Sequence, residues 1–236
     1  MTLVKSVAIH QPNFAPWLGY FFKIAHCDHF VILDNVDFQQ GNKDSITSRT
    51  KIKCNDEEKY FCISVKNNKE SKSIKDIKID KASTKIAKQI KTIYHNYSKS
   101  NHFNEIFPLI EQILIKYMEF EYLAEANTFV IMEFCKILDI KTPFAISSNL
   151  NLEREDRNDR IIEICKKLNS AIYFSGQGGK AYHDENLFRN NGIEIKYTNF
   201  KSIKYNQIGI DFISGLSIID ALLNEGVDNV KKLIQI

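Results

Sequence analysis

The pattern of apolar and polar residues predicts a strand, a helix and a second strand near the start of the chain. Residues 4–10 and 30–33 have the length and apolar character of buried strands, and residues 17–27 place Trp17, Phe21 and Ile24 on one helical face. Two strands joined by a single helix favour a parallel pair with a right-handed crossover. We therefore predict an α/β fold with a mainly parallel, Rossmann-like sheet whose first two strands are neighbours.

Similar patterns continue to the end of the chain. We predict further strands at residues 60–65, 74–79, 143–148, 171–174 and 193–200, and helices at 83–97, 102–118, 121–138, 157–168, 217–224 and 227–234. Gly226 separates the last two helices, and the polar stretch 34–49 is expected to be a loop. The chain is thus expected to form a single α/β domain over residues 1–236, with a mostly helical insertion around 83–139.

Composition narrows the class of protein. A hydrophobic content of 44% and a net charge of +3 are ordinary for a globular protein. No run approaches about eighteen apolar residues, and no apolar signal core precedes the first strand, so we expect a cytoplasmic protein without a membrane span. The cysteines show no Cys-x-x-Cys spacing and are expected to be free, buried thiols rather than metal ligands or disulfides; they are Cys27, Cys54, Cys62, Cys135 and Cys165.

Lysines are dense between residues 66 and 91. Such a stretch is compatible with contact to nucleic acid or to an anionic membrane. A dedicated nucleic-acid binder interleaves aromatic residues with its basic ones, and this stretch contains none. A solvated surface is therefore the favoured interpretation.

Polar and small residues gather where the first predicted strand gives way to the first helix. This turn carries His10, Gln11, Asn13, Trp17, Gly19 and Tyr20. Ligands of open α/β folds bind at such turns, where free backbone N–H groups attract anions. A histidine at a strand end can polarise a carbonyl or contact a phosphate, whereas the alternative is a ring that hydrogen-bonds its own loop. We expect His10 to belong to a site.

Asp34 and Arg49 mark the two ends of the polar stretch that follows the second strand. Asp34 is suited to hold a ribose, a magnesium ion or an amine, and the alternative is a cap of its own turn. Arg49 is suited to clamp a carboxylate or a phosphate, and the alternative is a surface ion pair. We expect both to converge with His10, Gln11 and Asn13 on one pocket.

A glycine-rich loop follows the predicted strand 171–174 and begins with Ser175 and Gly176. Its backbone N–H groups are suited to cradle an anion, although the spacing of a P-loop or of Gly-x-Gly-x-x-Gly is absent. Tyr182 follows the loop and could stack on a base or a sugar ring. Since parallel strands present their carboxyl ends on one side, we expect this loop to border the pocket of His10.

Several of these stretches together resemble a known family. They are residues 10–14 (His-Gln-Pro-Asn-Phe), 16–20 (Pro-Trp-Leu-Gly-Tyr), 33–38 (Leu-Asp-Asn-Val-Asp-Phe), Ser175-Gly176 with Tyr182, and 217–220 (Ser-Ile-Ile-Asp). Over nearly its whole length the chain looks like the WbqC-like protein family. It departs from the family pattern at Asn35 and Asp37, where a stretch of the type Asp-Asp-Val-Gln-Phe is expected.

This resemblance implies a role in the biosynthesis of O-antigen (lipopolysaccharide) or another bacterial surface polysaccharide. Some family members are assigned as glycine transferases, which place glycine on the amino group of an amino-sugar. Together with the strand-end chemistry above, it makes His10 and Asp34 the expected catalytic residues of a transferase acting on a nucleotide-linked amino-sugar. The expected binding residues are Gln11, Asn13, Trp17, Gly19, Tyr20, Arg49, Ser175, Gly176 and Tyr182.

The acyl donor and the cofactor stay open at this point. Glycine must be activated either as an adenylate, which brings in ATP and Mg²⁺, or as an aminoacyl-tRNA. A distant similarity to HUP-type nucleotidyltransferases is topological only, because the stretch 17–20 has neither histidine of their His-x-Gly-His motif. The alternative function is a non-catalytic nucleotide-sugar-binding or scaffold protein of the same pathway.

Overall fold

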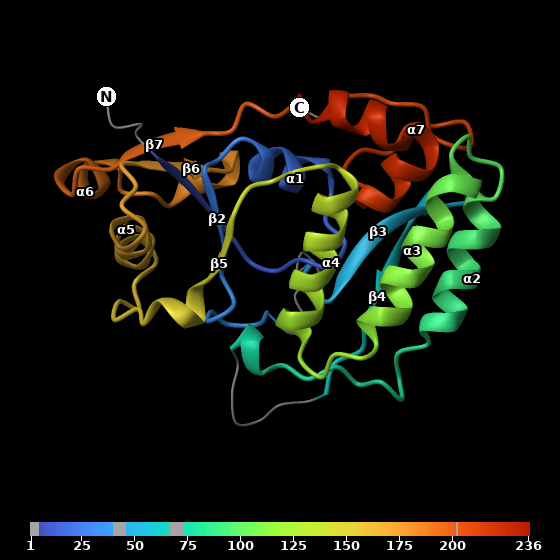
Figure 1. Ribbon diagram of the computed structural model, residues 1–236, viewed down its shortest axis with the longest axis horizontal. Helices are drawn as coiled ribbons and strands as arrows, with labels where there is room; N and C mark the ends of the chain where they lie inside the picture. The colour runs from blue at the N-terminus through green and yellow to red at the C-terminus, as the bar shows by residue number, and fades with distance from the viewer. Residues whose placement is uncertain (1–4, 40–45, 67–72, 202) are drawn as a thin grey trace.

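A five-stranded parallel sheet forms the centre of the protein, in a computed structural model that describes residues 5–39, 46–66, 73–201 and 203–236 (Figure 1). Its strands lie in the order β5-β2-β1-β6-β7. They are β1 (Ser6–His10), β2 (His29–Ile32), β5 (Phe144–Ile146), β6 (Ile172–Ser175) and β7 (Glu194–Tyr197). The first two strands pair in parallel from Val7 with His29 to His10 with Ile32. The predicted α/β fold with a parallel, Rossmann-like sheet is therefore confirmed.

Helices cover both faces of this sheet, and alternate strand residues face opposite layers. Ala8 and Phe30 belong to the larger apolar cluster, which contains α1 (Leu18–Ala25) and α4 (Leu123–Ile137). Val7, Ile9 and Val31 belong to a second cluster with α5 (Arg157–Lys167) and α6 (Glu185–Asn190). Figure 1 shows α5 and α4 on opposite sides of the sheet. A central strand with two covered faces is apolar throughout, which is why the pattern of β1 and β2 identified them.

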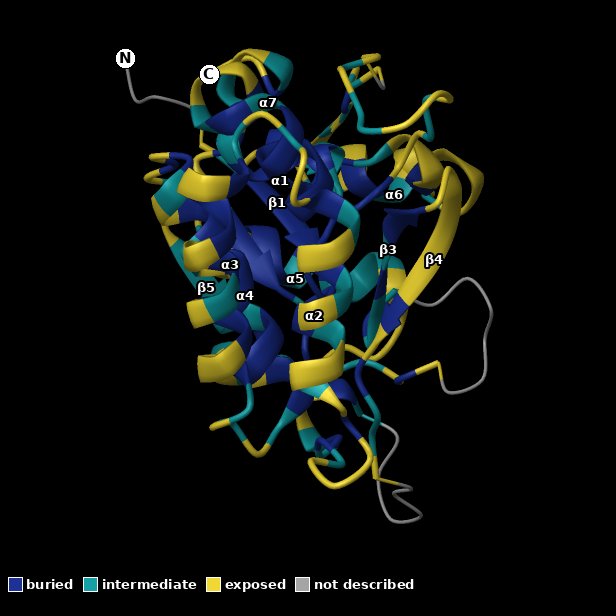
Figure 2. Ribbon diagram, turned by 90° about the vertical axis from the view of Figure 1, so that its right-hand side faces the viewer, coloured by how far each residue is buried: buried dark blue, intermediate teal, exposed yellow. Residues whose placement is uncertain are grey.

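The larger layer contains three more helices and a hairpin. These are α2 (Ile86–Tyr97), α3 (Phe103–Tyr117) and α7 (Ile218–Leu233), with the antiparallel strands β3 (Arg49–Cys54) and β4 (Glu57–Cys62). Figure 2 shows the exposed stripes of α2, α3 and α4 on the outside and their buried residues beneath. Gly226 interrupts α7 with a φ of 71°, as the break predicted there requires. Within the described residues, no helix is long and apolar enough to cross a membrane.

One predicted strand is absent from the structure, and several elements of the structure were not predicted. Residues 74–79 form no strand: η1 (Ile74–Asp76) is a 3₁₀ turn, because Ile74 and Lys75 donate backbone hydrogen bonds to the loop carbonyls of Val36 and Asp34 instead of to a strand. Strand β3 was not predicted, because Lys53 interrupts its apolar pattern although the residue is buried, with its ammonium 3.1 Å from Asp56 Oδ1. The short elements η3 (Gln177–Ala181) and α6 were also missed.

The cysteines are all free, as predicted. Four of them are buried, but Cys62 on β4 is exposed, so the prediction of burial is wrong for that residue. Residue 62 lies on the outward side of a two-stranded hairpin, which has only one face against the core.

Candidate functional site

A cleft lies at the carboxyl ends of β1 and β6, in the middle of the sheet. The chain leaves β1 through α1 to reach β2 on one side, whereas β6 on the other side follows α5. Such a reversal of strand order opens a crevice, and ligands of open α/β sheets bind there. Two adjoining cavities of about 520 Å³ and 360 Å³ share Ile9, His10, Tyr173 and Tyr182, and we call them together the cleft.

The two halves of the cleft differ in chemistry. The larger half, here the arginine cavity, is also lined by Gln11, Leu33, Val36, Asp37, Gln39, Glu155, Arg157, Arg160 and Ile161. The smaller half, here the glycine cavity, is also lined by Trp17, Gly19, Tyr20, Lys23, Ser175, Gly176, Gln177, Gly178, Gly179, Thr198 and Phe200. The structure thus brings the turn after β1 and the glycine-rich loop after β6 to one place.

His10 is the last residue of β1 and lines both halves. Its Nδ1 lies 3.2 Å from the carbonyl oxygen of Gln11, which can only accept, so this nitrogen carries the proton and Nε2 is left as an acceptor. The ring packs edge-on against Tyr20, with centroids 4.7 Å apart. Burial and the nearby charge of Lys23 lower the pKa of His10 to about 3. The imidazole is therefore neutral at physiological pH.

Lys23 projects from the apolar face of α1 into the glycine cavity and is 5% exposed. Its ammonium donates to the carbonyl oxygen of Ile9 at 2.7 Å. Among the described residues no carboxylate forms an ion pair with it. Burial lowers the pKa of Lys23 to about 8. Lys23 was not among the expected site residues, although a lysine between Phe22 and Ile24 on a buried helix face is an available signal in the sequence.

The glycine-rich loop needs its glycines for two different reasons. A Cβ on Gly179 would lie 2.4 Å from Cε1 of His183 and 2.5 Å from Oγ of Ser175, so this position admits no side chain without a shift. A Cβ on Gly176 or Gly178 would have no described atom within 4 Å of it. The main chain at these two positions therefore borders open space in the cleft, where a ligand can approach it closely.

Aromatic rings surround the glycine cavity. The indole of Trp17 lies over Gly19, where a Cβ would come within 2.3 Å of it, and packs edge-on against Phe200 at 5.4 Å. The hydroxyl of Tyr20 donates to the carbonyl oxygen of Gln11 at 2.9 Å. Tyr182 is 49% exposed at the boundary of the two halves. These rings offer flat apolar surface of the kind that stacks on sugars and bases.

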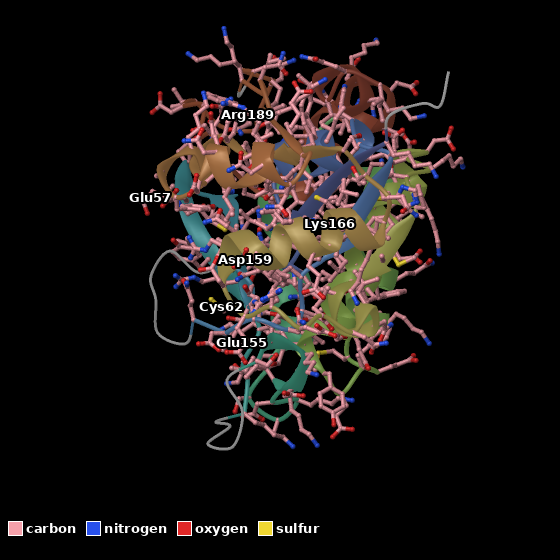
Figure 3. All side chains as sticks on the ribbon, turned by 90° about the vertical axis from the view of Figure 1, so that its left-hand side faces the viewer. Glu57, Cys62, Glu155, Asp159, Lys166 and Arg189 are labelled. Atoms are coloured by element: carbon pink, nitrogen blue, oxygen red, sulfur yellow. The ribbon has the colours of Figure 1, made fainter. Side chains whose placement is uncertain are left out.

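The arginine cavity presents charges of both signs. Arg157 opens α5 and its guanidinium lies 4.3 Å above the ring of Tyr182. Arg160 donates to the carbonyls of Arg154 and Glu155, which holds the segment before the helix. Figure 3 shows Glu155 before α5 and Asp159 near its beginning, with Lys166 near its end. The cavity thus combines two guanidinium groups with the carboxylates of Asp37 and Glu155, a set suited to a ligand that carries both a phosphate and an amine.

The remaining residues of the β1 turn hold its shape. Asn13 is buried and does not line the cleft. The side chain of Asn127 on α4 donates to the carbonyls of Pro12 at 2.8 Å and of Thr47 at 2.7 Å. On the other side, Ser217 donates to the carbonyl of Ala15 at 2.7 Å. The turn that carries His10 is therefore fixed from two helices.

Asp34 lies elsewhere than expected. Its carboxylate accepts hydrogen bonds from the hydroxyls of Ser147 and Ser148 at 2.8 and 2.6 Å and from the backbone N–H of Ser148 at 2.9 Å. It thereby holds the 3₁₀ turn η2 (Ser147–Leu150) after β5 and borders a separate cavity against α4. The structure does not bring Asp34 into the cleft with His10.

Arg49 is also separated from the cleft. It starts β3 in the hairpin, and its guanidinium lies 4.4 Å above the ring of Tyr60 on β4. The expected convergence therefore holds for His10 and Gln11, but not for Asn13, Asp34 and Arg49. Among the described residues, no group of three or more histidine, cysteine or acidic side chains is arranged to hold a metal ion.

The comparisons with known proteins extend over nearly the whole chain. The model of the WbqC-like protein family matches residues 11–232. The chain is 29% identical over 230 residues to the uncharacterized protein Rv1507c of Mycobacterium tuberculosis, which covers 95% of this chain and 96% of that protein. No solved structure matches the chain. The family model spans both loops of the cleft, and the chain belongs to the WbqC-like protein family.

Proposed function

We propose that this protein is a transferase that acylates the amino group of a nucleotide-linked amino-sugar, with glycine as the acyl group, in the biosynthesis of a bacterial surface polysaccharide. Membership of the WbqC-like family supports the pathway, because the family resemblance implies a role in surface-polysaccharide biosynthesis. The cleft carries the proposal, because it joins guanidinium groups for phosphates, aromatic rings for a sugar or base and a neutral histidine at one strand end.

The proposed reaction uses His10 as the proton acceptor. The lone pair of the sugar amine forms a C–N bond to the activated acyl carbon, and the bond from that carbon to its leaving group breaks and takes its electron pair along. The amine proton passes to Nε2 of His10, whose other nitrogen is occupied by the carbonyl of Gln11. Asp37 and Glu155 line the same half of the cleft and are suited to hold the amine before it reacts.

The donor is either a glycyl adenylate or a glycyl-tRNA. ATP would bring Mg²⁺, but among the described residues no group of three or more histidine, cysteine or acidic side chains is arranged to hold a metal ion, and the carboxylate of Asp34 already accepts hydrogen bonds from Ser147 and Ser148. No step is therefore assigned to a metal. A direct role of Asp34 in catalysis would require its carboxylate to leave these partners, so we propose that it positions the turn after β5 instead.

A non-catalytic nucleotide-sugar-binding protein is the second candidate. One observation favours it: a histidine with a pKa of about 3 is a weak base, and weak bases accelerate proton transfer little. The cleft would then hold the same ligand through the same guanidinium groups and rings, without a transfer step.

A paired experiment separates the two candidates. Thermal unfolding is measured with a nucleotide-linked amino-sugar, where saturation at a hundred times the dissociation constant adds about 2.7 kcal/mol to the free energy of unfolding. The same sugar is then incubated with glycyl-tRNA, or with ATP and glycine, and the product is sought by mass spectrometry. A glycylated sugar that wild type forms and His10→Ala does not supports the transferase. Binding without product from either donor supports the binding protein, and no binding contradicts both.

A further inference from the structure

Lys23 holds a buried positive charge that the described part of the protein satisfies only in part. An ammonium group has three N–H donors, and the single acceptor found for it is the carbonyl oxygen of Ile9. The described titratable side chains close to Lys23 carry no negative charge that could pair with its ammonium. The ring of His10 is neutral, and burial raises the pKa of the Cys27 thiol to about 12, so that this thiol is also uncharged at neutral pH.

Such an arrangement costs stability. A charge taken out of water without an opposite charge is penalised by several kcal/mol. An apolar side chain of similar length would fit the same helix face, since Phe22 and Ile24 beside it are buried among apolar groups. A buried charge without an opposite charge beside it therefore points to a site where a bound ligand supplies that opposite charge.

The surroundings of the ammonium favour an anionic ligand. Lys23 shares the glycine cavity with the main chain of Gly176 and Gly178, which borders open space. Behind Gly179 lies His183, whose Nε2 is buried and makes no hydrogen bond with any described residue. Burial and then the charge of Lys23 lower the pKa of His183. Polar donors therefore surround this end of the cleft, and none of the described residues that line it is acidic.

We infer that the glycine cavity is a subsite for an anionic oxygen group, a phosphate or a carboxylate, and that Lys23 supplies its counter-charge. The inference rests on the proposed function in placing the ligand in the same cleft. The group would be a phosphate of the nucleotide-linked sugar or the carboxylate of the amino-acid donor. A guest anion also offers acceptors to the two N–H groups that Ile9 leaves free.

Two small anions, phosphate and acetate, test this subsite without any transfer reaction. The unfolding midpoint is measured against increasing phosphate, and separately against increasing acetate, at an ionic strength held constant with chloride. The variants are Lys23→Met and, as a matched control, Lys180→Met. Lys180 lies in η3 of the glycine-rich loop, not on α1, and it is exposed, with its ammonium 5.0 Å above the ring of Tyr197.

Wild type and Lys180→Met are expected to gain stability in a saturable manner, and Lys23→Met is expected to lose affinity for the ion at least tenfold. Without the ion, Lys23→Met is expected to be at least as stable as wild type, because a buried charge has been removed. A response to phosphate alone assigns the phosphate source, and a response to acetate assigns the carboxylate source. The inference is overturned if the anion stabilises Lys23→Met as much as wild type, or if Lys23→Met and Lys180→Met lose the same affinity for the anion.

A second measurement covers the case in which Lys23→Met does not fold. In wild type labelled with ¹³C at the lysine ε carbons, the resonance of Lys23 is titrated with and without phosphate. The bound anion is expected to raise the pH of its titration midpoint by one unit or more, and an unchanged midpoint contradicts the subsite. Because neither measurement needs an acyl donor or a sugar, a missing transferase activity would leave the outcome unaffected.

Discussion

At the scale of the residue, the protonation of His10 follows from its place at the end of β1. The folded ring stays neutral down to about pH 3, whereas an unfolded histidine titrates near its ordinary value of 6.5. Between these values the unfolded state binds more protons, so the free energy of unfolding falls as the pH drops through this window. We predict that His10→Gln loses this pH dependence of the free energy of unfolding, which amounts to up to ~1.4 kcal/mol per pH unit in wild type. Urea unfolding of wild type and His10→Gln at pH 7 and pH 4.5 measures the difference. If both proteins lost the same free energy between the two pH values, the ring would be protonated in the folded state.

Gly19 makes a second prediction at this scale. Any Cβ there would come within 2.3 Å of the Trp17 indole, so Gly19→Ala must displace the ring from the glycine cavity. Trp17 is the only tryptophan of the chain, and its emission reports its surroundings alone. We expect a red-shifted emission and weaker ligand binding for Gly19→Ala. Gly178→Ala, where no described atom lies within 4 Å of the new Cβ, is the control that should keep the wild-type emission. An unshifted spectrum for Gly19→Ala would place the indole elsewhere.

At the scale of the element, the start of α7 fixes the turn that carries His10. Asp220 on its first turn is fully buried and accepts from the hydroxyls of Tyr97 at 2.7 Å and Tyr205 at 2.6 Å. The residue before this helix, Ser217, caps it and also binds the carbonyl of Ala15. The late Ser-Ile-Ile-Asp stretch thus joins α7 to α2 and to the β1 turn.

We predict that Asp220→Ala lowers the free energy of unfolding by roughly 2–4 kcal/mol, because the hydroxyls of buried Tyr97 and half-buried Tyr205 lose their acceptor. Asp228 lies exposed on the same helix, and Asp228→Ala should change the same quantity by no more than about 0.5 kcal/mol. Chemical denaturation of the three proteins makes the comparison. If the two variants were equally stable, the network would not hold α7 in place.

Strands whose two faces are both buried were predictable from the sequence, whereas a strand that contains a buried charged residue was not. β1 and β2 are covered on both faces, so their apolar runs predicted both the strands and their pairing. β3 contains Lys53, whose burial depends on a partner three residues away at Asp56, and no pattern of hydrophobicity shows that. Residues 74–79 contain three buried isoleucines, but their backbone partners come from loops distant in sequence.

At the scale of the whole molecule, the residues that line the cleft were predictable only where they directly follow the end of a parallel strand. The turn after β1 and the loop after β6 meet because parallel strands end at one edge, so His10, Gln11 and Gly176 fall into one site. Arg157 and Lys23 lie on helices, and their approach to that edge depends on how α5 and α1 pack. Asp34 and Arg49 also adjoin strand ends, but the first turns toward η2 and the second lies in the separate hairpin.

The location of the ligand in this cleft is the central claim, and calorimetric titration of a nucleotide-linked amino-sugar tests it most directly. The proteins compared are wild type, His10→Ala and Arg49→Ala, since Arg49 lies in the hairpin and does not line the cleft. Far-ultraviolet circular dichroism checks that each is folded. We predict saturable binding to wild type, an affinity reduced at least tenfold, or by about 1.4 kcal/mol, in His10→Ala, and an unchanged affinity in Arg49→Ala. Unchanged binding by His10→Ala together with lost binding by Arg49→Ala would contradict the account and move the site to the hairpin.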